Sequence, residues 1–159
     1  MGKHEDSFKA VQFLIDNFDN IVIDADAINL YNFGNCNLLL TPHLGELSRL
    51  NIKNSRDNLM SFAKSNNVSL LLKGEKDYIT NGDYFKINTT GHPRMAVGGT
   101  GDLLSGLCGG LIAKGLSPFE AGRLAAYSLG KAGELCYEEC GASFLPTDLS
   151  LCISKILSS

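Results

Sequence analysis

The sequence predicts an α/β domain in which helices flank a layered sheet. Short apolar runs alternate with stretches that carry apolar residues at helical spacing, and the final third of the chain has a helical pattern throughout. Several apolar runs end in a polar or charged residue, as buried parallel strands do at the edge of a sheet. We therefore expect a single domain over residues 1–159, with polar side chains gathered where the strands end.

The composition narrows the class of protein. The chain has 159 residues, 44% of them hydrophobic and 19% charged, with a net charge of −3. It is long enough to bury a core, and the lack of a basic stripe argues against a nucleic-acid partner. No apolar run reaches the roughly 18 residues that a membrane span needs. The N-terminal stretch MGKHEDSFKA lacks the apolar core of a signal peptide, so a cytoplasmic location is predicted.

Five cysteines are spread along the chain without CxxC spacing. Cys136 and Cys140 stand four residues apart, which places them on one helix face and could supply two metal ligands. No second ligand pair is visible, and the simpler interpretation is reduced, mostly buried thiols in a cytosolic protein. The sequence therefore predicts no metal site built from these cysteines.

The first predicted elements are a helix over residues 7–18 and a buried parallel strand over 21–24. Asp24 and Asp26 lie at the carboxyl end of that strand, the edge where ligands gather in open α/β sheets. The apolar positions that predict the helix are Phe8, Val11, Leu14, Ile15 and Phe18.

Two further apolar runs, at 38–40 and 68–72, predict buried strands. The first is closed by Thr41-Pro42-His43 and the second by Lys73-Gly74, so each again ends in polar residues. A helical turn after His43 and a helix at 55–65 connect these two strands.

A hairpin follows, because Asn81-Gly82 between two β-prone runs is a strong turn signal. Its strands are predicted at 78–80 and 84–87, and residues 88–97 are expected to form a loop.

Three helices complete the chain, at 102–114, from Pro118 to near Gly141, and at 149–157. Proline at the first turn favours the start of the second, and Pro146-Thr147-Asp148 is expected to cap the third. The side predicted to be buried on the second helix consists of Ala121, Leu124, Ala125, Ser128, Leu129, Ala132 and Leu135.

The segment Gly98-Gly99-Thr100-Gly101-Asp102 has the composition of a tight loop that feeds the first turn of a helix. Glycine permits positive φ and close approach of a ligand. A helix N-terminus offers unpaired N–H groups and a partial positive charge, which suit an anion such as phosphate. Asp102 would be either a carboxylate within reach of that anion or simply the N-cap of the helix.

Four segments, in this order, resemble the ADP/ATP-dependent NAD(P)H-hydrate dehydratase family of the ribokinase-like superfamily. They span most of the chain, and such an array is far more specific than the glycine motif alone. The segments are Asp24-Ala25-Asp26-Ala27-Ile28-Asn29, Thr41-Pro42-His43-Leu44-Gly45-Glu46, Leu72-Lys73-Gly74-Glu75-Lys76-Asp77-Tyr78-Ile79, and Asn88-Thr89-Thr90-Gly91 leading into Met95-Ala96-Val97-Gly98-Gly99-Thr100-Gly101-Asp102.

The resemblance implies a ribokinase-like layered sheet with flanking helices, N-terminally truncated because the match begins partway through the family's domain. It also implies repair of hydrated NADH and NADPH by phosphoryl transfer from ADP or ATP to the substrate hydroxyl, followed by loss of phosphate. The alternatives are a small-molecule, sugar-like kinase of the same superfamily, and a non-catalytic nucleotide-binding remnant or one half of a split enzyme.

By resemblance, Gly99, Gly101 and Asp102 are the catalytic residues, with amides that hold the phosphoryl group and a carboxylate that accepts the hydroxyl proton. His43 and Asp102 would contact the substrate. The adenine nucleotide would be bound by Lys73, Gly74, Glu75, Lys76, Asp77, Gly98, Gly99, Thr100 and Gly101. Asp77 stands where many relatives have threonine.

Other interpretations of the remaining candidates stay open. His43 could pair only with a backbone group, Glu46 could cap the turn that follows, and Lys73 could be a solvated strand-end lysine. Asp24 and Asp26 could position a hydrated Mg²⁺ or merely form a turn. The expected partners are NAD(P)H hydrate and an adenine nucleotide, together with a second copy of the chain or a separate chain that supplies the rest of the domain.

Overall fold

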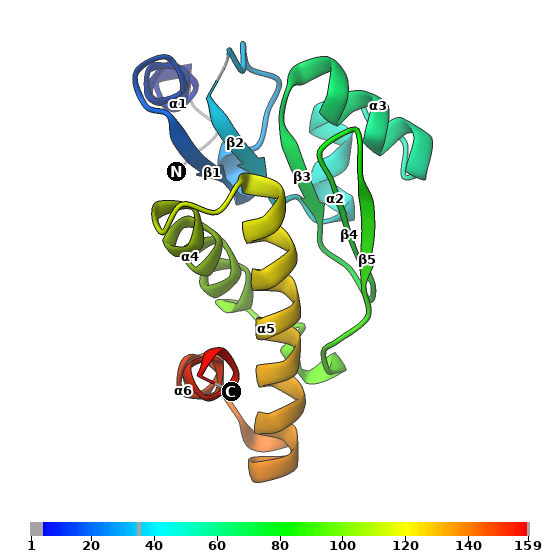
Figure 1. The fold of residues 1–159 in the computed structure, drawn as a ribbon, viewed down its shortest axis with the longest axis vertical. Coiled ribbons are helices and arrows are strands. Elements are labelled where there is room, and N and C mark those ends of the chain that lie inside the picture. Colours follow the sequence, from blue (N-terminus) through cyan, green and yellow to red (C-terminus); the bar gives the residue numbers. More distant parts are fainter. Residues whose placement is uncertain (1–4, 35, 159) are drawn as a thin grey trace.

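The computed structural model describes residues 5–34 and 36–158. Met1–His4, the start of the polar N-terminal stretch, lie outside the described residues, as do Asn35 and Ser159. Five strands form one sheet in the order β1-β2-β3-β4-β5 (Figure 1). The strands are β1 (Asn20–Ile23), β2 (Asn37–Leu40), β3 (Ser69–Leu72), β4 (Asp77–Thr80) and β5 (Phe85–Asn88).

The sheet is parallel from β1 to β3 and antiparallel from β3 to β5. The three buried runs of the sequence are therefore the parallel strands, as predicted. The hairpin at Asn81-Gly82 is also confirmed, with Gly82 at φ +93° and Tyr78 opposite Ile87. A change to antiparallel pairing at β3 needs only a short connection, and Lys73–Lys76 supplies it.

The helices lie close to their predicted ranges. The first helix begins at Glu5, the helix after the glycine motif begins two residues before its predicted start, and the last helix begins at Pro146. Ser117 caps the helix that starts at Pro118 by accepting a hydrogen bond from the amide of Glu120. The helices are α1 (Glu5–Asn17), α2 (Leu44–Leu47), α3 (Arg56–Asn66), α4 (Thr100–Ala113), α5 (Pro118–Cys140) and α6 (Pro146–Leu157), with single 3₁₀ turns at Ala25–Ala27, Ser48–Leu50, Pro93–Met95 and Gly141–Ser143.

The parallel strands carry two cores, one on each face of the sheet. Leu39 and Leu71 pack with α4, α5 and α6, whereas Leu38 and Leu40 pack on the opposite face with α1 and α3. Alternate residues of a strand point to opposite faces, so a continuous leucine run serves both cores. Figure 1 shows α5 running beside the sheet, with α4 and α6 on the side of α5 away from β4 and β5.

Two predicted apolar faces are less buried than their spacing indicates. On α1, Val11 and Ile15 are buried, but Phe8, Leu14 and Phe18 are 38%, 42% and 56% exposed. On α5, Leu124 is 37% exposed and Leu135 is only partly buried, whereas the other predicted positions are buried. The helical spacing identifies the apolar side of each helix correctly. How much of that side is buried depends on how much of it the neighbouring elements contact.

Glycines of α5 hold the loop that leads to the glycine motif. A Cβ atom added at Gly130 would lie 2.1 Å from Thr90 Oγ1, and one added at Gly133 would lie 2.0 Å from Met95 Sδ. Only glycine allows this loop to approach the helix so closely. The contacts fix the path of residues 88–97 into the start of α4.

No helix in the described part of the chain is long and apolar enough to cross a membrane.

Candidate functional site

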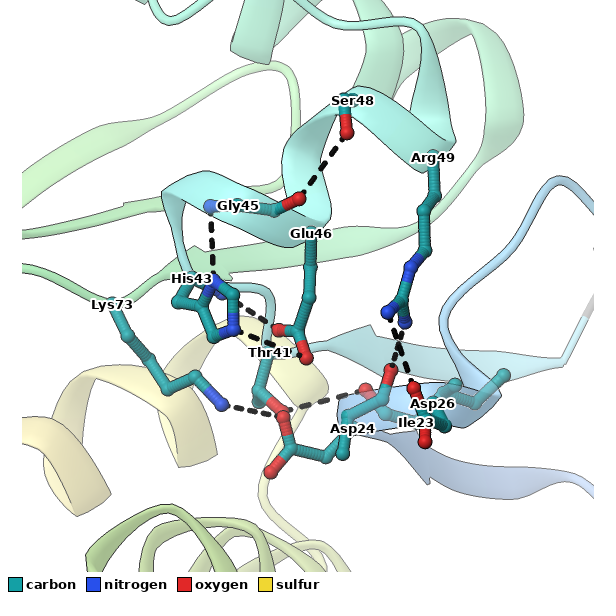
Figure 2. Close-up of polar contacts among 11 residues, drawn as sticks. Ile23, Asp24, Asp26, Thr41, His43, Gly45, Glu46, Ser48, Arg49 and Lys73 are labelled. Atoms are coloured by element: carbon teal, nitrogen blue, oxygen red, sulfur yellow. Dashed lines mark hydrogen bonds and ion pairs between the residues drawn. The ribbon is translucent and has the colours of Figure 1, made fainter. Parts of the chain in front are cut away.

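Three polar side chains meet where the parallel strands end. Asp24 follows β1, His43 follows β2 and Lys73 follows β3. Beyond the ends of β2 and β3, His43 and Lys73 form an isolated parallel β-bridge, and the Lys73 amide donates to the Pro42 carbonyl at 2.8 Å. Figure 2 shows the three side chains extending into one region. The predicted gathering of polar residues at this edge is confirmed.

Asp24 and Lys73 form an ion pair across that edge. Lys73 Nζ lies 2.5 Å from Asp24 Oδ1, and the side chains are 19% and 13% exposed (Figure 2). The interpretation of Lys73 as a solvated lysine is therefore wrong. The pair holds the ammonium group in place at the end of β3, where it can act as a fixed positive charge.

The glycine segment lies directly against this ion pair. A Cβ atom added at Gly101 would be 3.6 Å from both Asp24 Oδ2 and Lys73 Nζ. Gly99 is the N-cap of α4 with φ +98°, a conformation that L side chains rarely adopt, and a Cβ there would lie 3.4 Å from Pro146 Cβ. The loop before α4 and the strand ends thus form one site.

The N-terminus of α4 has the groups that bind an anion. The amide N–H groups of Gly98, Gly99, Gly101 and Asp102 have no acceptor within residues 5–34 and 36–158. The buried Thr100 Oγ1 also has no partner among those residues. Unpaired amides at a helix start, with an orphaned hydroxyl and the Lys73 ammonium beside them, suit a phosphate of a nucleotide.

Asp102 is the third residue of α4 and not its N-cap, because the helix begins at Thr100 with Gly99 as the cap. The N-cap interpretation is therefore wrong. The Asp102 side chain is exposed and makes no hydrogen bond or ion pair within the described chain, although its carbonyl accepts a hydrogen bond from Ser105. Its carboxylate is free to contact a ligand at the start of the helix.

His43 and Glu46 form a capping box at the start of α2. His43 Nδ1 accepts a hydrogen bond from the Gly45 amide at 2.9 Å, and Glu46 Oε2 accepts one from the His43 amide at 2.9 Å. The proposed capping role of Glu46, which is buried, is thereby confirmed. Glu46 Oε1 lies 3.5 Å from His43 Nε2, and the His43 side chain remains 59% exposed. His43 pairs with the backbone and can still meet a ligand.

Asp24 and Asp26 have different partners. The Arg49 guanidinium donates to Asp26 Oδ1 at 3.1 Å and to the Ala25 carbonyl at 3.0 Å (Figure 2). A turn does form at Ala25–Ala27, with Ala25 at φ +54°. Both carboxylates are thus in ion pairs, and the described residues contain no group of three His, Cys, Asp or Glu side chains that could hold a metal.

The segment after β3 is held by Asp77. Asp77 Oδ1 accepts a hydrogen bond from the Gly74 amide at 3.1 Å, and Oδ2 accepts one from Asn88 Nδ2 at 3.0 Å. Burial raises the pKa of Asp77, while these hydrogen bonds and Lys73 act in the opposite direction. Glu75 and Lys76 are exposed. Asp77 thus ties the Lys73-Gly74 turn to the end of β5. Each of its two carboxylate oxygens accepts a hydrogen bond from the protein.

The sequence did not indicate that α6 takes part in the site. Pro146, its first residue, packs on Gly99. The two residues are far apart in the chain, and no periodicity or motif connects them. Thr90 lies in one of the four segments of the resemblance, and its hydroxyl donates to Asn88 Oδ1 at 2.8 Å, while Asn88 donates to Asp77.

A family model described as NAD(P)H-hydrate dehydratase matches residues 1–155. The chain belongs to the NAD(P)H-hydrate dehydratase family. One relative is the ADP-dependent (S)-NAD(P)H-hydrate dehydratase of Cenarchaeum symbiosum, which is 35% identical over 91% of this chain and 54% of its own length.

Solved structures support the same family and its fold. The ADP/ATP-dependent NAD(P)H-hydrate dehydratase of Bacillus subtilis, co-crystallised with ATP and Mg²⁺, is 26% identical with a TM-score of 0.88 over 99% of this chain and 63% of its own. A ribokinase-like superfamily protein of Enterococcus faecalis has a TM-score of 0.82 at 24% identity, over 99% of this chain and 60% of its own. The predicted ribokinase-like α/β fold is confirmed.

The chain is shorter than the family members it matches. It spans 31%, 54% and 55% of the lengths of three curated relatives, and 63% of the Bacillus subtilis chain. The site described above lies wholly within the shared part.

Proposed function

We propose that this chain carries out ADP- or ATP-dependent dehydration of hydrated NAD(P)H, through phosphoryl transfer to the substrate hydroxyl. The observation that carries the proposal is the start of α4. There, among the residues that the structure describes, the amides of Gly98, Gly99 and Gly101 and the carboxylate of Asp102 have no partner, and they lie beside the Asp24–Lys73 ion pair. A phosphoryl transfer site needs anion-binding donors and a base at one point, and this point has both.

The amides at the start of α4 would hold the transferring phosphoryl group. When bound, the nucleotide supplies that group. Gly99 and Gly101 keep the backbone open to the ligand, because a side chain at Gly99 is strained and one at Gly101 would extend toward Lys73. The partial positive charge of the helix N-terminus and the fixed Lys73 ammonium would stabilise the negative charge.

Asp102 would accept the proton of the attacking hydroxyl. Its position in the first turn of α4 places the carboxylate beside the amides, and both oxygens are available because no residue in the described ranges 5–34 and 36–158 pairs with them. His43, exposed at the end of β2, would contact the substrate, with its ring orientation fixed by the Gly45 amide and Glu46. General-base catalysis typically contributes 10²–10⁴-fold to a rate.

The segment Lys73–Asp77 would line the adenine nucleotide, and Asp77 would act by shaping the turn, since its oxygens already accept two protein hydrogen bonds. Mg²⁺ would enter with the nucleotide phosphates, because Asp24 and Asp26 are held in ion pairs with Lys73 and Arg49. The Bacillus subtilis relative was crystallised with ATP and Mg²⁺, which supports nucleotide use.

We also propose that the chain works in the cytoplasm and self-associates. Within the described residues, β1 pairs only with β2, so its other edge is open. The helix that precedes β1 in the chain carries the α1 apolar face, which we define as Phe13, Leu14 and Phe18 and which is exposed by 61%, 42% and 56%. An open edge and exposed apolar side chains are the kinds of surface that a second chain covers. A second copy of this chain is the occupant we propose.

The test is recovery of NADH absorbance from hydrated NADH with ADP or ATP present, alongside calorimetric titration of each nucleotide. Recovery of absorbance that requires the nucleotide is the expected result. Nucleotide binding without turnover would point to the non-catalytic half of a split enzyme. A retained phosphorylated product with no NADH recovery would point to a small-molecule kinase. Absence of nucleotide binding would overturn the dehydratase, the kinase and the nucleotide-binding half alike.

A further inference from the structure

The contact between α5 and α6 contains two cysteines in direct contact. Cys136 Sγ on α5 lies 2.6 Å from Cys152 Sγ on α6. Both residues are buried, with 2% and 4% of their surface exposed. A disulfide bond has a sulfur–sulfur distance of about 2.05 Å, so closure needs a movement of only about half an ångström.

Burial keeps this pair as thiols and leaves little thiolate for a peroxide to attack, so oxidation should be slow and should need prolonged exposure to excess peroxide. Burial, with Cys152 as the nearest neighbour, raises the pKa of Cys136 to about 12. Asp148 and Cys140 also raise the pKa of Cys136. Of the other cysteines, Cys140, one turn further along α5, is exposed, Cys36 is partly buried and Cys108 is buried.

We propose that Cys136 and Cys152 form a reversible disulfide when the protein meets a peroxide, and that this bond locks α6 onto α5. One thiol is oxidised by hydrogen peroxide to a sulfenic acid with release of water. The second thiol attacks that sulfur, the sulfur–sulfur bond forms, and a second water leaves. Two thiols lose two electrons and two protons, and the peroxide is reduced to water. A small thiol such as glutathione reverses the step by exchange.

The bond would affect the glycine segment at residues 98–101 through α6. Pro146, the first residue of α6, packs on Gly99, and Gly99 caps α4. Cys152 lies within the same helix, so fixing it to α5 also fixes Pro146 against the loop. The inference stands on the packing of α5 and α6 and does not depend on the proposed reaction.

The experiment treats the fully reduced protein with hydrogen peroxide, blocks the remaining thiols, and maps disulfides by digestion and mass spectrometry without reduction. The expected product is one intramolecular link between the peptides that carry Cys136 and Cys152, with the loss of two hydrogen atoms. Glutathione should restore the starting mass. Because the link closes a short loop, the melting temperature should rise by about 5–10 °C on oxidation.

Variants separate this pair from the other cysteines. Cys140→Ser and Cys108→Ala should keep the link and the rise in melting temperature, and Cys152→Ala should abolish both. Hydrogen exchange of α6 and of residues 98–101 should slow in the oxidised wild type, a comparison that needs no variant. A link that involves Cys140, only intermolecular links, or no link in the wild type would overturn the proposal. Unchanged exchange at residues 98–101 would overturn the coupling to the loop.

Discussion

At the scale of single residues, Asp102 differs from the other carboxylates near the site in its lack of a partner within the described residues. Asp24, Asp26, Glu46 and Asp77 each accept hydrogen bonds or form ion pairs with the protein. Asp102 has none in the described chain, and it sits where α4 exposes its free amides. A carboxylate kept without a structural partner at such a point has its oxygens available for a ligand.

We expect Asp102→Asn to lower turnover of hydrated NADH by 10²–10⁴-fold, because the amide cannot accept the hydroxyl proton. The same change should alter the free energy of unfolding by less than about 0.5 kcal/mol, since the side chain is exposed and unpaired. Absorbance kinetics and urea denaturation measure the two effects. Asp57→Asn, which changes an exposed aspartate in the first turn of α3, is the matched control and should leave turnover unchanged.

The burial of Asp77 leads to a prediction about how the free energy of unfolding depends on pH. Because burial raises its pKa in the folded protein, the native state binds a proton more readily than the unfolded chain does. The ionised carboxylate therefore lowers stability at neutral pH, and this penalty is relieved as the pH falls toward the native pKa. Asp77→Asn cannot titrate, so wild type should gain stability relative to this variant between pH 7 and about pH 4.

Urea denaturation of both proteins at several pH values checks the Asp77 prediction. Loss of one hydrogen-bond acceptor in the variant adds a cost that does not depend on pH and cancels in the comparison. A difference in the free energy of unfolding that stays constant with pH, or that shifts toward the variant on acidification, would show that burial does not control this carboxyl group.

At the scale of elements, the glycines of α5 set the distance between that helix and the loop that enters the site. Asn88 Nδ2 donates to the Ala126 carbonyl at 3.3 Å, and the Thr90 hydroxyl, which donates to Asn88, lies 3.3 Å from the Tyr127 carbonyl. The Glu134 carboxylate accepts a hydrogen bond from the Gly91 amide at 3.0 Å. The loop is thus attached along α5 before the chain reaches Gly98.

Gly130→Ala should destabilise the protein by about 1–3 kcal/mol, because its Cβ would lie 2.7 Å from the Thr90 backbone. Gly109→Ala is the matched control, since it also changes a helical glycine but has no atom within 4 Å of the new Cβ. The control should be neutral or more stable by up to about 1 kcal/mol. Equal free energies of unfolding for the two variants in urea would refute the close-approach argument.

At the scale of the whole molecule, the centre of the sheet is covered on both faces, and both edge strands, β1 and β5, are less buried. The cores formed with α4, α5 and α6 and with α1 and α3 are both complete around β2 and β3. Toward β1 the coverage thins, and Ile21 and Val22 are only partly buried. Parallel strands are usually buried on both faces, so this side of the molecule is where association is expected.

We expect wild type to sediment as an oligomer and Phe13→Asp to dissociate it, because a charge on the exposed α1 apolar face opposes burial. Leu151→Asp alters a leucine on α6 that is 68% exposed and should leave the assembly intact. Analytical ultracentrifugation of the three proteins gives the answer. A wild-type monomer at micromolar concentration would contradict self-association, and a co-purifying second polypeptide would assign the surface to that chain.

The sequence determined most of the fold. Leucine runs, helical spacing and an Asn-Gly turn are local signals, and the elements they predict are present within a few residues. It also placed Asp24, His43 and Lys73 at one edge, because parallel strands bring their carboxyl ends together. The glycine motif was predicted to begin a helix, and it does, two residues earlier than expected.

Only the tertiary structure decided how these residues are used. It paired Lys73 with Asp24, made Gly99 rather than Asp102 the helix cap, gave Glu46 a capping role and left Asp102 free. It also brought Pro146 onto Gly99 and Cys152 onto Cys136. Periodicity reports which side of an element is apolar, but a contact between distant residues depends on how whole elements pack, and no local pattern encodes that distance.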